Sequence, residues 1–87
     1  MKTKLNAAAR QAEKDALREY KEWETDWQDA DNVFLSVYDA VFCAWLEATG
    51  RRVGETDEEL EANDQAFMDD PVADAVMAPY TEKYNAR

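Results

Sequence analysis

The chain has 87 residues and a formal net charge of −10, and a domain of this size has room for one core because it buries only about 60 to 65% of the unfolded surface. Hydrophobic residues make up 46% of it, with two glycines and two prolines, which favours an ordered helical protein over a disordered or turn-rich β chain. The chain has no histidine, and its one cysteine, Cys43, has apolar and acidic neighbours. We therefore expect that it is not an enzyme and that it binds no metal or cofactor. A single cysteine also fits a reducing, cytoplasmic setting.

The first predicted helix runs from about residue 4 to residue 28, because a narrow apolar stripe recurs there with helical spacing. The stripe consists of Leu5, Ala9, Ala12, Ala16, Tyr20, Trp23 and Trp27. The other faces are sorted by charge, with Asp15, Glu19, Glu22 and Asp26 on one flank and Arg10, Lys14, Arg18 and Lys21 opposite. These charges are either an ordinary solvated surface or a binding surface. Because like charges three and four residues apart cost about 0.2 to 0.5 kcal/mol each, helix stability does not explain the acidic row.

Residues 29 to 32, with the sequence DADN, allow two interpretations. Asp and Asn are good N-caps and poor interior residues, so one helix can end and another begin here. The apolar stripe nevertheless continues in phase to Ala48, and the alternative is a single bent helix over residues 4–49. We expect the break, because a compact domain is easier to build from a helical hairpin than around a rod. A rod would need a second copy to cover its seam and would form a homodimer.

The most apolar stretch is VFLSVYDAVFCAWL, residues 33 to 46. Its few polar positions fall in one strip about 80° wide on a helical wheel. That strip consists of Asn32, Ser36, Asp39, Cys43 and Glu47. A helix that is apolar around the rest of its circumference must be covered by neighbours, and 14 residues are too few for the roughly 20 that cross a bilayer. We predict that it is the central core helix.

The central helix is predicted to end at Gly50 with a left-handed C-cap. Arg51 and Arg52 follow, where positive charge suits the negative end of the helix dipole. These arginines lie between two acidic blocks, and we expect them to be available for pairing with carboxylates such as Glu47 or Asp64.

A third helix is predicted over residues 57 to 69, because Thr56 and Glu59 match a capping box in which Glu59 reaches back to the N-cap. Turning Leu60 and Phe67 toward the core leaves four polar residues outside. These are Glu58, Glu61, Gln65 and Asp69. Asp64 then lies only about 40° from Leu60, so it either meets an arginine or is exposed on a lightly docked helix.

Asp70 and Pro71 predict the N-cap and first residue of a fourth helix. One face of this helix carries Val72, Val76, Tyr80 and Tyr84. Proline breaks or kinks a helix, so we expect the helix to end near Met77 and a last turn to begin at Pro79. The sequence therefore predicts an all-α protein, a small bundle of three to four helices around a central apolar helix, in a single acidic domain over residues 1–87.

Charge is unevenly distributed along the chain. Residues 1 to 21 sum to +3, residues 22 to 50 hold seven carboxylates and no Lys or Arg, and residues 53 to 82 hold ten carboxylates and no base. Affinity for nucleic acid comes largely from Lys and Arg, so we expect no direct binding to nucleic acid. We also expect no membrane partner. Such a field favours a basic protein, and nucleic-acid-binding proteins are the typical class.

These observations lead to the hypothesis of an inhibitor that occupies the nucleic-acid-binding surface of a basic partner, as a DNA mimic. Carboxylates three and four apart on a helix are about 5 to 6 Å apart, comparable to phosphates along one DNA strand. Phage anti-CRISPR and anti-restriction proteins and nuclease immunity proteins form an analogous class of small acidic inhibitors. The candidate partner-binding residues form two surfaces, Asp15, Glu19, Glu22, Asp26, Asp29 and Asp31 on the first, and Glu55, Glu58, Glu61, Asp69, Asp70 and Asp74 on the second.

The alternative hypothesis is a helical adaptor or assembly subunit that binds a partner or itself through the apolar aromatic stripe. Tyr20, Trp23 and Trp27 would then be the interface anchors, as buried aromatic residues often are. On this hypothesis the acidity serves solubility, and neutralising the carboxylates changes binding little.

Overall fold

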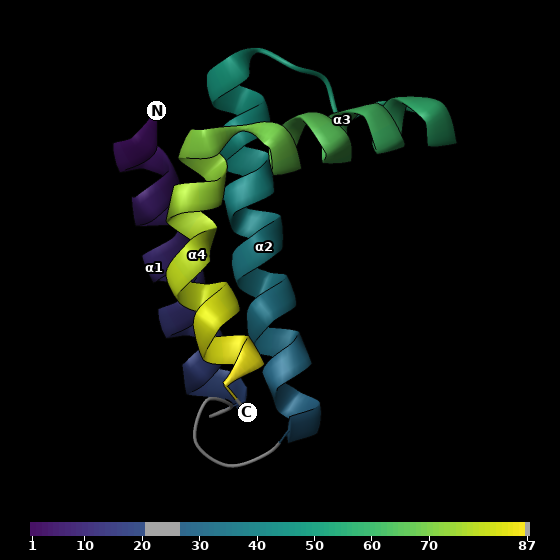
Figure 1. Ribbon diagram of the computed structural model, residues 1–87. Coiled ribbons are helices and arrows are strands. Elements are labelled where there is room, and N and C mark those ends of the chain that lie inside the picture. Colours follow the sequence, from purple (N-terminus) through teal and green to yellow (C-terminus); the bar gives the residue numbers. More distant parts are fainter. Residues whose placement is uncertain (21–26, 87) are drawn as a thin grey trace.

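The computed structural model describes residues 1–20 and 27–86, apart from the side chains of residues 20 and 27–29. Within this part of the chain there are four helices and no strand: α1 (Lys2–Tyr20), α2 (Trp27–Thr49), α3 (Asp57–Asp69) and α4 (Pro71–Asn85). Helices α1, α2 and α4 run side by side, and α3 crosses one end of them and projects to one side (Figure 1). This confirms the predicted small all-α bundle. None of these helices has the length and apolar character needed to span a membrane.

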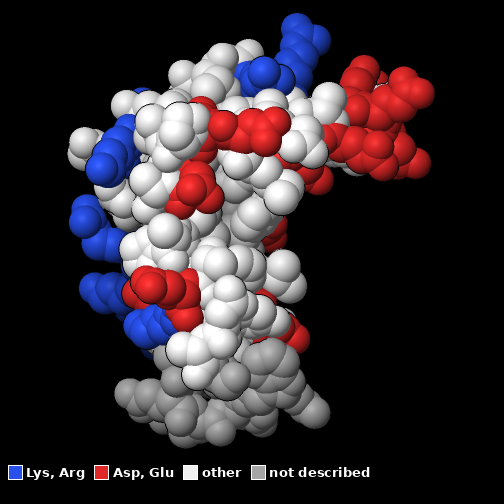
Figure 2. Space-filling view, viewed as in Figure 1, with Lys and Arg blue, Asp and Glu red and all other residues white. Residues whose placement is uncertain are grey.

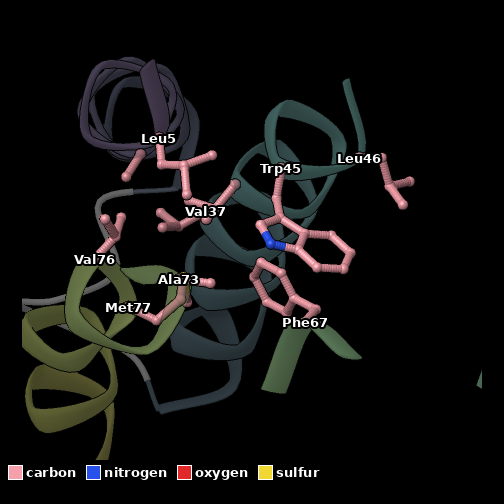
Figure 3. Packing of buried hydrophobic residues seen from close by; sticks show 10 residues of the cluster. Leu5, Val37, Trp45, Leu46, Phe67, Ala73, Val76 and Met77 are labelled. Carbon is pink, nitrogen blue, oxygen red and sulfur yellow. The ribbon is translucent and has the colours of Figure 1, made fainter. Parts of the chain in front are cut away.

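Helix α2 is the central helix, as predicted. Val33, Val37 and Val41 on one of its faces are wholly buried. Leu5 from α1 and Val76 from α4 pack into the same cluster as Val37 (Figure 3). The predicted polar strip faces outward, with Asn32, Asp39, Cys43 and Glu47 exposed and Ser36 partly buried. The expectation that neighbours cover the whole apolar circumference is wrong at one position, because Leu35 is 54% exposed.

The expected helical hairpin is confirmed, because α1 and α2 are separate helices that pack against each other, but the expected break at residues 29–32 is wrong, because these residues lie within α2. The predicted end of the first helix at residue 28 is wrong, since Trp27 already belongs to α2. Asp29 therefore lies in the first turn of α2, where a carboxylate suits the positive end of the helix dipole. The single bent helix over residues 4–49 is excluded, because Trp45 and Val41, which would line its seam, lie in the core.

Helix α2 ends as predicted at Gly50, whose φ of 72° is in the left-handed region. The amide of Gly50 donates to the carbonyl of Glu47 at 3.2 Å, and that of Arg51 donates to the carbonyl of Leu46 at 2.9 Å. These two bonds form a Schellman motif. The guanidinium of Arg51 then lies 5.4 Å from the centre of the Trp45 ring.

The arginines form no ion pair with Glu47 or Asp64 within the described residues. Arg51 instead makes a long 3.5 Å contact with Oδ1 of Asn63. Asp64 is exposed, which is the second of the two outcomes expected for it.

Helix α3 has the predicted bounds, and its N-cap works largely as expected. The amide of Glu59 donates to Oγ1 of Thr56 at 3.2 Å. The Glu59 carboxylate reaches back one residue further than predicted and accepts from the amide of Glu55 at 2.7 Å. The helix start is therefore capped from both sides without any tertiary contact.

The prediction that Leu60 turns toward the core is wrong, because it is 40% exposed and Asn63 is buried in its place. The Asn63 amide donates to the carbonyls of Arg52 and Val53 at 2.8 and 3.0 Å. A leucine could not satisfy these two carbonyls, and unpaired buried carbonyls are costly. Hydrogen bonding to the preceding loop thus decides which face of α3 is covered.

Phe67 fixes the C-terminal end of α3 to α2. Its ring makes edge contacts with Tyr38, Phe42 and Trp45, at centroid distances of 5.2, 5.2 and 5.4 Å. The Trp45 indole N–H donates to Oδ2 of Asp70 at 2.8 Å, at the junction of α3 and α4. These contacts anchor the C-terminal half of α3 to α2 and α4, and the N-terminal half projects from the bundle (Figure 1).

Helix α4 begins as predicted, with Asp70 as N-cap and Pro71 at the first position. The predicted end near Met77 is wrong, because the helix continues through Pro79 to Asn85. Pro79 and Ala75 are both exposed, so water can satisfy the Ala75 carbonyl that loses its helical donor. Tyr84 packs on Phe34 with a centroid distance of 4.8 Å, which holds the last turn against α2.

Candidate protein-binding surface

Four of the six residues of the second predicted acidic surface lie on the projecting helix α3 or just before it. We define the acidic arm as residues 55–69, which comprise α3 and the two residues before it. Its carboxylates are Glu55, Asp57, Glu58, Glu59, Glu61, Asp64 and Asp69, and all are exposed. The arm contains no Lys or Arg. Figure 2 shows carboxylates gathered over the projecting end of this helix.

Helix stability explains only part of this acidity. Asp57, Glu58 and Glu59 lie in the first turn, where negative charge favours the helix. Asp69 lies in the last turn, where negative charge opposes it, and no basic residue is present there. Gln65 donates to both oxygens of Asp69 at 3.1 Å, which orients the carboxylate without neutralising it.

No carboxylate of the acidic arm forms an ion pair within the described residues. An ion pair is found elsewhere, between Lys83 of α4 and Glu13 of α1, with 3.4 Å between Nζ and Oε2. The charge of the arm is therefore left to solvent and to whatever binds there.

Asp70 belongs to the second predicted surface but is occupied by contacts within the fold. Its Oδ2 accepts from Trp45 and its Oδ1 accepts from the amide of Val72 at 2.8 Å. The hydrogen bond from Trp45 lowers the pKa of Asp70 most, with a smaller contribution from the amides of Val72 and Ala73. Asp74, one turn later, is exposed.

The first predicted surface is described only in part. Asp15 and Glu19 are exposed on α1, and Asp15 accepts from Nε2 of Gln11 at 3.0 Å. Asp31 accepts a hydrogen bond from the Tyr84 hydroxyl, and this bond is the main cause that raises the pKa of Tyr84. The remaining side chains of that surface and the aromatic anchors of the adaptor hypothesis lie outside the described residues. They are Glu22, Asp26, Asp29, Tyr20, Trp23 and Trp27.

The basic residues of α1 lie on a different side of the molecule from the acidic arm (Figure 2), whereas Arg51 contacts Asn63 of the arm. Arg10, Lys14 and Arg18 are exposed on α1, and Lys21 lies outside the described residues. In Figure 2, Lys and Arg line the side of the bundle away from the acidic arm, over α1, and a further group lies above the loop that follows α2. This separation of charge can orient the molecule as it approaches a charged partner.

One feature that the sequence did not predict is an apolar hollow of about 150 Å³ between α2, the end of α3 and α4. We name it the α2–α4 groove. It is lined by Phe34, Tyr38, Phe67, Met68, Ala73, Asp74, Met77 and Thr81. Met68 is the most accessible of the apolar residues, with 65% of its surface exposed. The only signal in the sequence was Met68 next to the buried Phe67, and the crossing of α3 over α2 was needed to interpret it.

No group of three or more carboxylate or thiol side chains in the described part of the chain could hold a metal ion. The chemistry that the described surface offers is the recognition of positive charge by the acidic arm and of an apolar group by the α2–α4 groove. Comparison with protein-family models, with characterised proteins and with solved structures found no match for this chain.

Proposed function

We propose that this protein is a non-enzymatic inhibitor that binds a basic protein and occupies its nucleic-acid-binding surface. The observation that carries the proposal is the acidic arm, a projecting helix whose carboxylates are exposed and form no ion pair within the described residues. Inhibitors that block CRISPR or restriction complexes and immunity proteins that neutralise basic nucleases belong to this functional class.

The spacing of charge along the arm supports mimicry of a nucleic-acid strand. Helix α3 has 13 residues and is about 20 Å long at 1.5 Å per residue. One strand of B-DNA carries a phosphate about every 3.4 Å, or about six over that length. The helix itself carries six carboxylates, Asp57, Glu58, Glu59, Glu61, Asp64 and Asp69. The arm thus matches one strand in charge per unit length.

The shape of the molecule supports the same proposal. The N-terminal half of α3 extends beyond the bundle, so its carboxylates can enter a basic groove without the bundle clashing with the walls (Figure 1). The basic residues of α1 lie away from the arm (Figure 2). A positively charged partner is therefore attracted to the arm and repelled from α1.

The test uses the partner captured from the native host on the immobilised protein. We expect capture to weaken steeply between about 50 and 200 mM salt and to be competed by duplex DNA. Neutralising the arm with Glu58→Gln and Glu61→Gln should weaken binding about tenfold, because each exposed charge contributes up to about 1 kcal/mol. The matched control is Glu47→Gln with Glu82→Gln, which removes the same charge from outside the arm.

Two results would overturn the proposal. One is capture that is equally strong at low and high salt, and the other is simultaneous binding of DNA and this protein by the partner. If the arm variant and the control variant weaken binding equally, binding depends on net charge and the arm is not part of the interface. Salt-insensitive capture would favour the adaptor hypothesis.

A further inference from the structure

The α2–α4 groove has the size of a single side chain. A cavity of about 150 Å³ in a protein core holds a benzene molecule, and pockets for cofactors and drug-sized ligands measure about 300 to 1,000 Å³. The groove, at about 150 Å³, is therefore suited to one Leu, Met or Phe side chain. Unlike a core cavity, it is open to solvent, and Met68 in its lining is 65% exposed.

The walls of the groove are apolar and well held. Phe67 and Met77 are buried, and Tyr38 makes an edge contact with Phe67 at 5.2 Å. Met68 forms the accessible rim, and methionine adapts its shape to different apolar partners. An incoming apolar side chain would thus cover Met68 and leave the surrounding core as it is.

The rim of the groove is acidic. Asp74 is one of its lining residues. Asp64 and Asp39 lie close enough to the Tyr38 hydroxyl for their charges to raise its pKa, after burial, which is the largest cause. No lining residue is basic, and none of these three carboxylates forms an ion pair within the described residues. The groove therefore favours an apolar side chain that is flanked by positive charge.

We propose that the α2–α4 groove binds one large apolar side chain from a Lys- or Arg-rich segment of the partner protein, while Asp74 in its lining pairs with a flanking cation. The inference rests on the proposed function, because it assumes the positively charged partner named there. It adds an apolar anchor next to the acidic arm, so that binding depends on shape as well as on charge.

A second copy of this chain fits the groove less well. Arg51 and Arg52 of a second copy lie next to the exposed Val53, but Arg51 is already held over the Trp45 ring, and valine is smaller than the Leu, Met or Phe side chain that the groove fits. The exposed basic residues of α1 include Arg10, Lys14 and Arg18. The residues between them, QAEKDAL, contain only one large apolar side chain, Leu17, which is partly buried. The copy would also bring a net charge of −10 toward an acidic rim. A basic partner of different sequence is favoured on both grounds.

The probe is a helical 15-residue peptide of alanine and lysine with a single central leucine, compared with the same peptide carrying alanine at that position. Binding is followed by NMR on the methyl groups of Met68 and Met77. We expect both methyl signals to shift and the leucine peptide to bind about tenfold more tightly than the alanine peptide, because one leucine side chain is buried.

Two charge-matched variants locate the bound leucine. Met68→Lys and Leu60→Lys both place a lysine at an exposed apolar position of α3, but only the first lies in the groove. We expect Met68→Lys to abolish the tenfold preference for leucine and Leu60→Lys to keep it. Equal preference in both variants, or shifts at methyl groups away from the groove, would overturn the inference. Both variants must retain the dispersed NMR spectrum of the folded protein.

The groove and the proposed function are tested by different measurements, so one can be rejected without the other. If neither peptide is preferred but capture of the host partner still depends on salt and DNA, the groove is rejected and the proposed function stands. If leucine is preferred but DNA does not compete with the partner, the groove stands and DNA mimicry is rejected. Concentration-dependent dimerisation that Met68→Lys abolishes would overturn the inference in favour of a second copy.

Discussion

The three packed helices and the acidic arm are held by different forces. Helices α1, α2 and α4 share one apolar cluster, which includes Leu5, Val37 and Val76. The arm contributes Phe67 to that cluster, with Ala66 packed against it, and Asn63 attaches the arm to the loop after α2 by hydrogen bonds. Burial thus stabilises the bundle, whereas the arm combines one aromatic anchor with polar contacts. A helix held in this way can keep a surface whose charges are explained only in part by stability.

The largest expected effect is on the free energy of unfolding, which the same Leu→Ala substitution should change by different amounts in the two regions. Leu5→Ala removes a wholly buried side chain from the bundle and should lower the free energy of unfolding by about 2 to 5 kcal/mol. Leu60→Ala, on the exposed side of the arm, should change it by only about 0.5 kcal/mol. Urea denaturation followed by circular dichroism measures both. Similar losses would mean that the arm is part of the main core.

An intermediate effect should come from the junction between the two regions. Trp45→Phe keeps an aromatic ring near Phe67 but removes the indole N–H that Asp70 accepts. We expect a loss of about 1 to 3 kcal/mol, since the acceptor is charged. Amide hydrogen exchange should accelerate more in α3 than in α1, because the lost bond holds the α3–α4 junction. Uniform acceleration would contradict a separately held arm.

The same variant should change the dependence of stability on pH. The pKa of Asp70 is lowered in the fold, chiefly by the bond from Trp45. A lowered carboxyl pKa stabilises the fold above the ordinary aspartate value of about 3.9, and this stabilisation is lost as the pH falls through the folded value. The penalty of Trp45→Phe should therefore be full near neutral pH and shrink below about pH 4. A penalty that stays constant down to about pH 2.5 would contradict this assignment.

The smallest effect should be a gain in stability within the arm. Asp69→Asn removes a negative charge from the last turn of α3 and should stabilise the protein by about 0.3 to 1 kcal/mol. The same change should weaken binding to a basic partner. A variant that gains stability and loses affinity would indicate that Asp69 is present for recognition. Loss of both would indicate a role in the fold, through its contact with Gln65.

Much of the fold could be predicted because its signals are local. The Thr56 cap, the Asp70–Pro71 start and the Gly50 stop each depend on atoms within a few residues, and the structure confirms all three. The apolar character of residues 33–46 identified the central helix for a similar reason, since periodicity alone shows which faces must be covered. The positions of carboxylates along α3 were equally predictable.

The orientation of α3 was not predictable from its own residues. Helical periodicity favoured Leu60 over Asn63 as a buried residue, but the carbonyls of Arg52 and Val53 needed a donor. These carbonyls come from a loop whose path depends on where α3 crosses α2. The prediction that Pro79 ends the preceding helix was wrong, because the cost of a proline within a helix depends on whether water or protein surrounds the carbonyl that loses its donor.

The sequence by itself determined the helices, their caps, the central position of residues 33–46 and the excess of negative charge, because each depends on composition or on neighbours along the chain. Tertiary structure decided that Asp70 contacts Trp45, that the carboxylates of the acidic arm are left to solvent, and that Met68 and Asp74 meet in one groove. These features join residues from different helices, and only the packing of α3 across α2 and α4 brings them together.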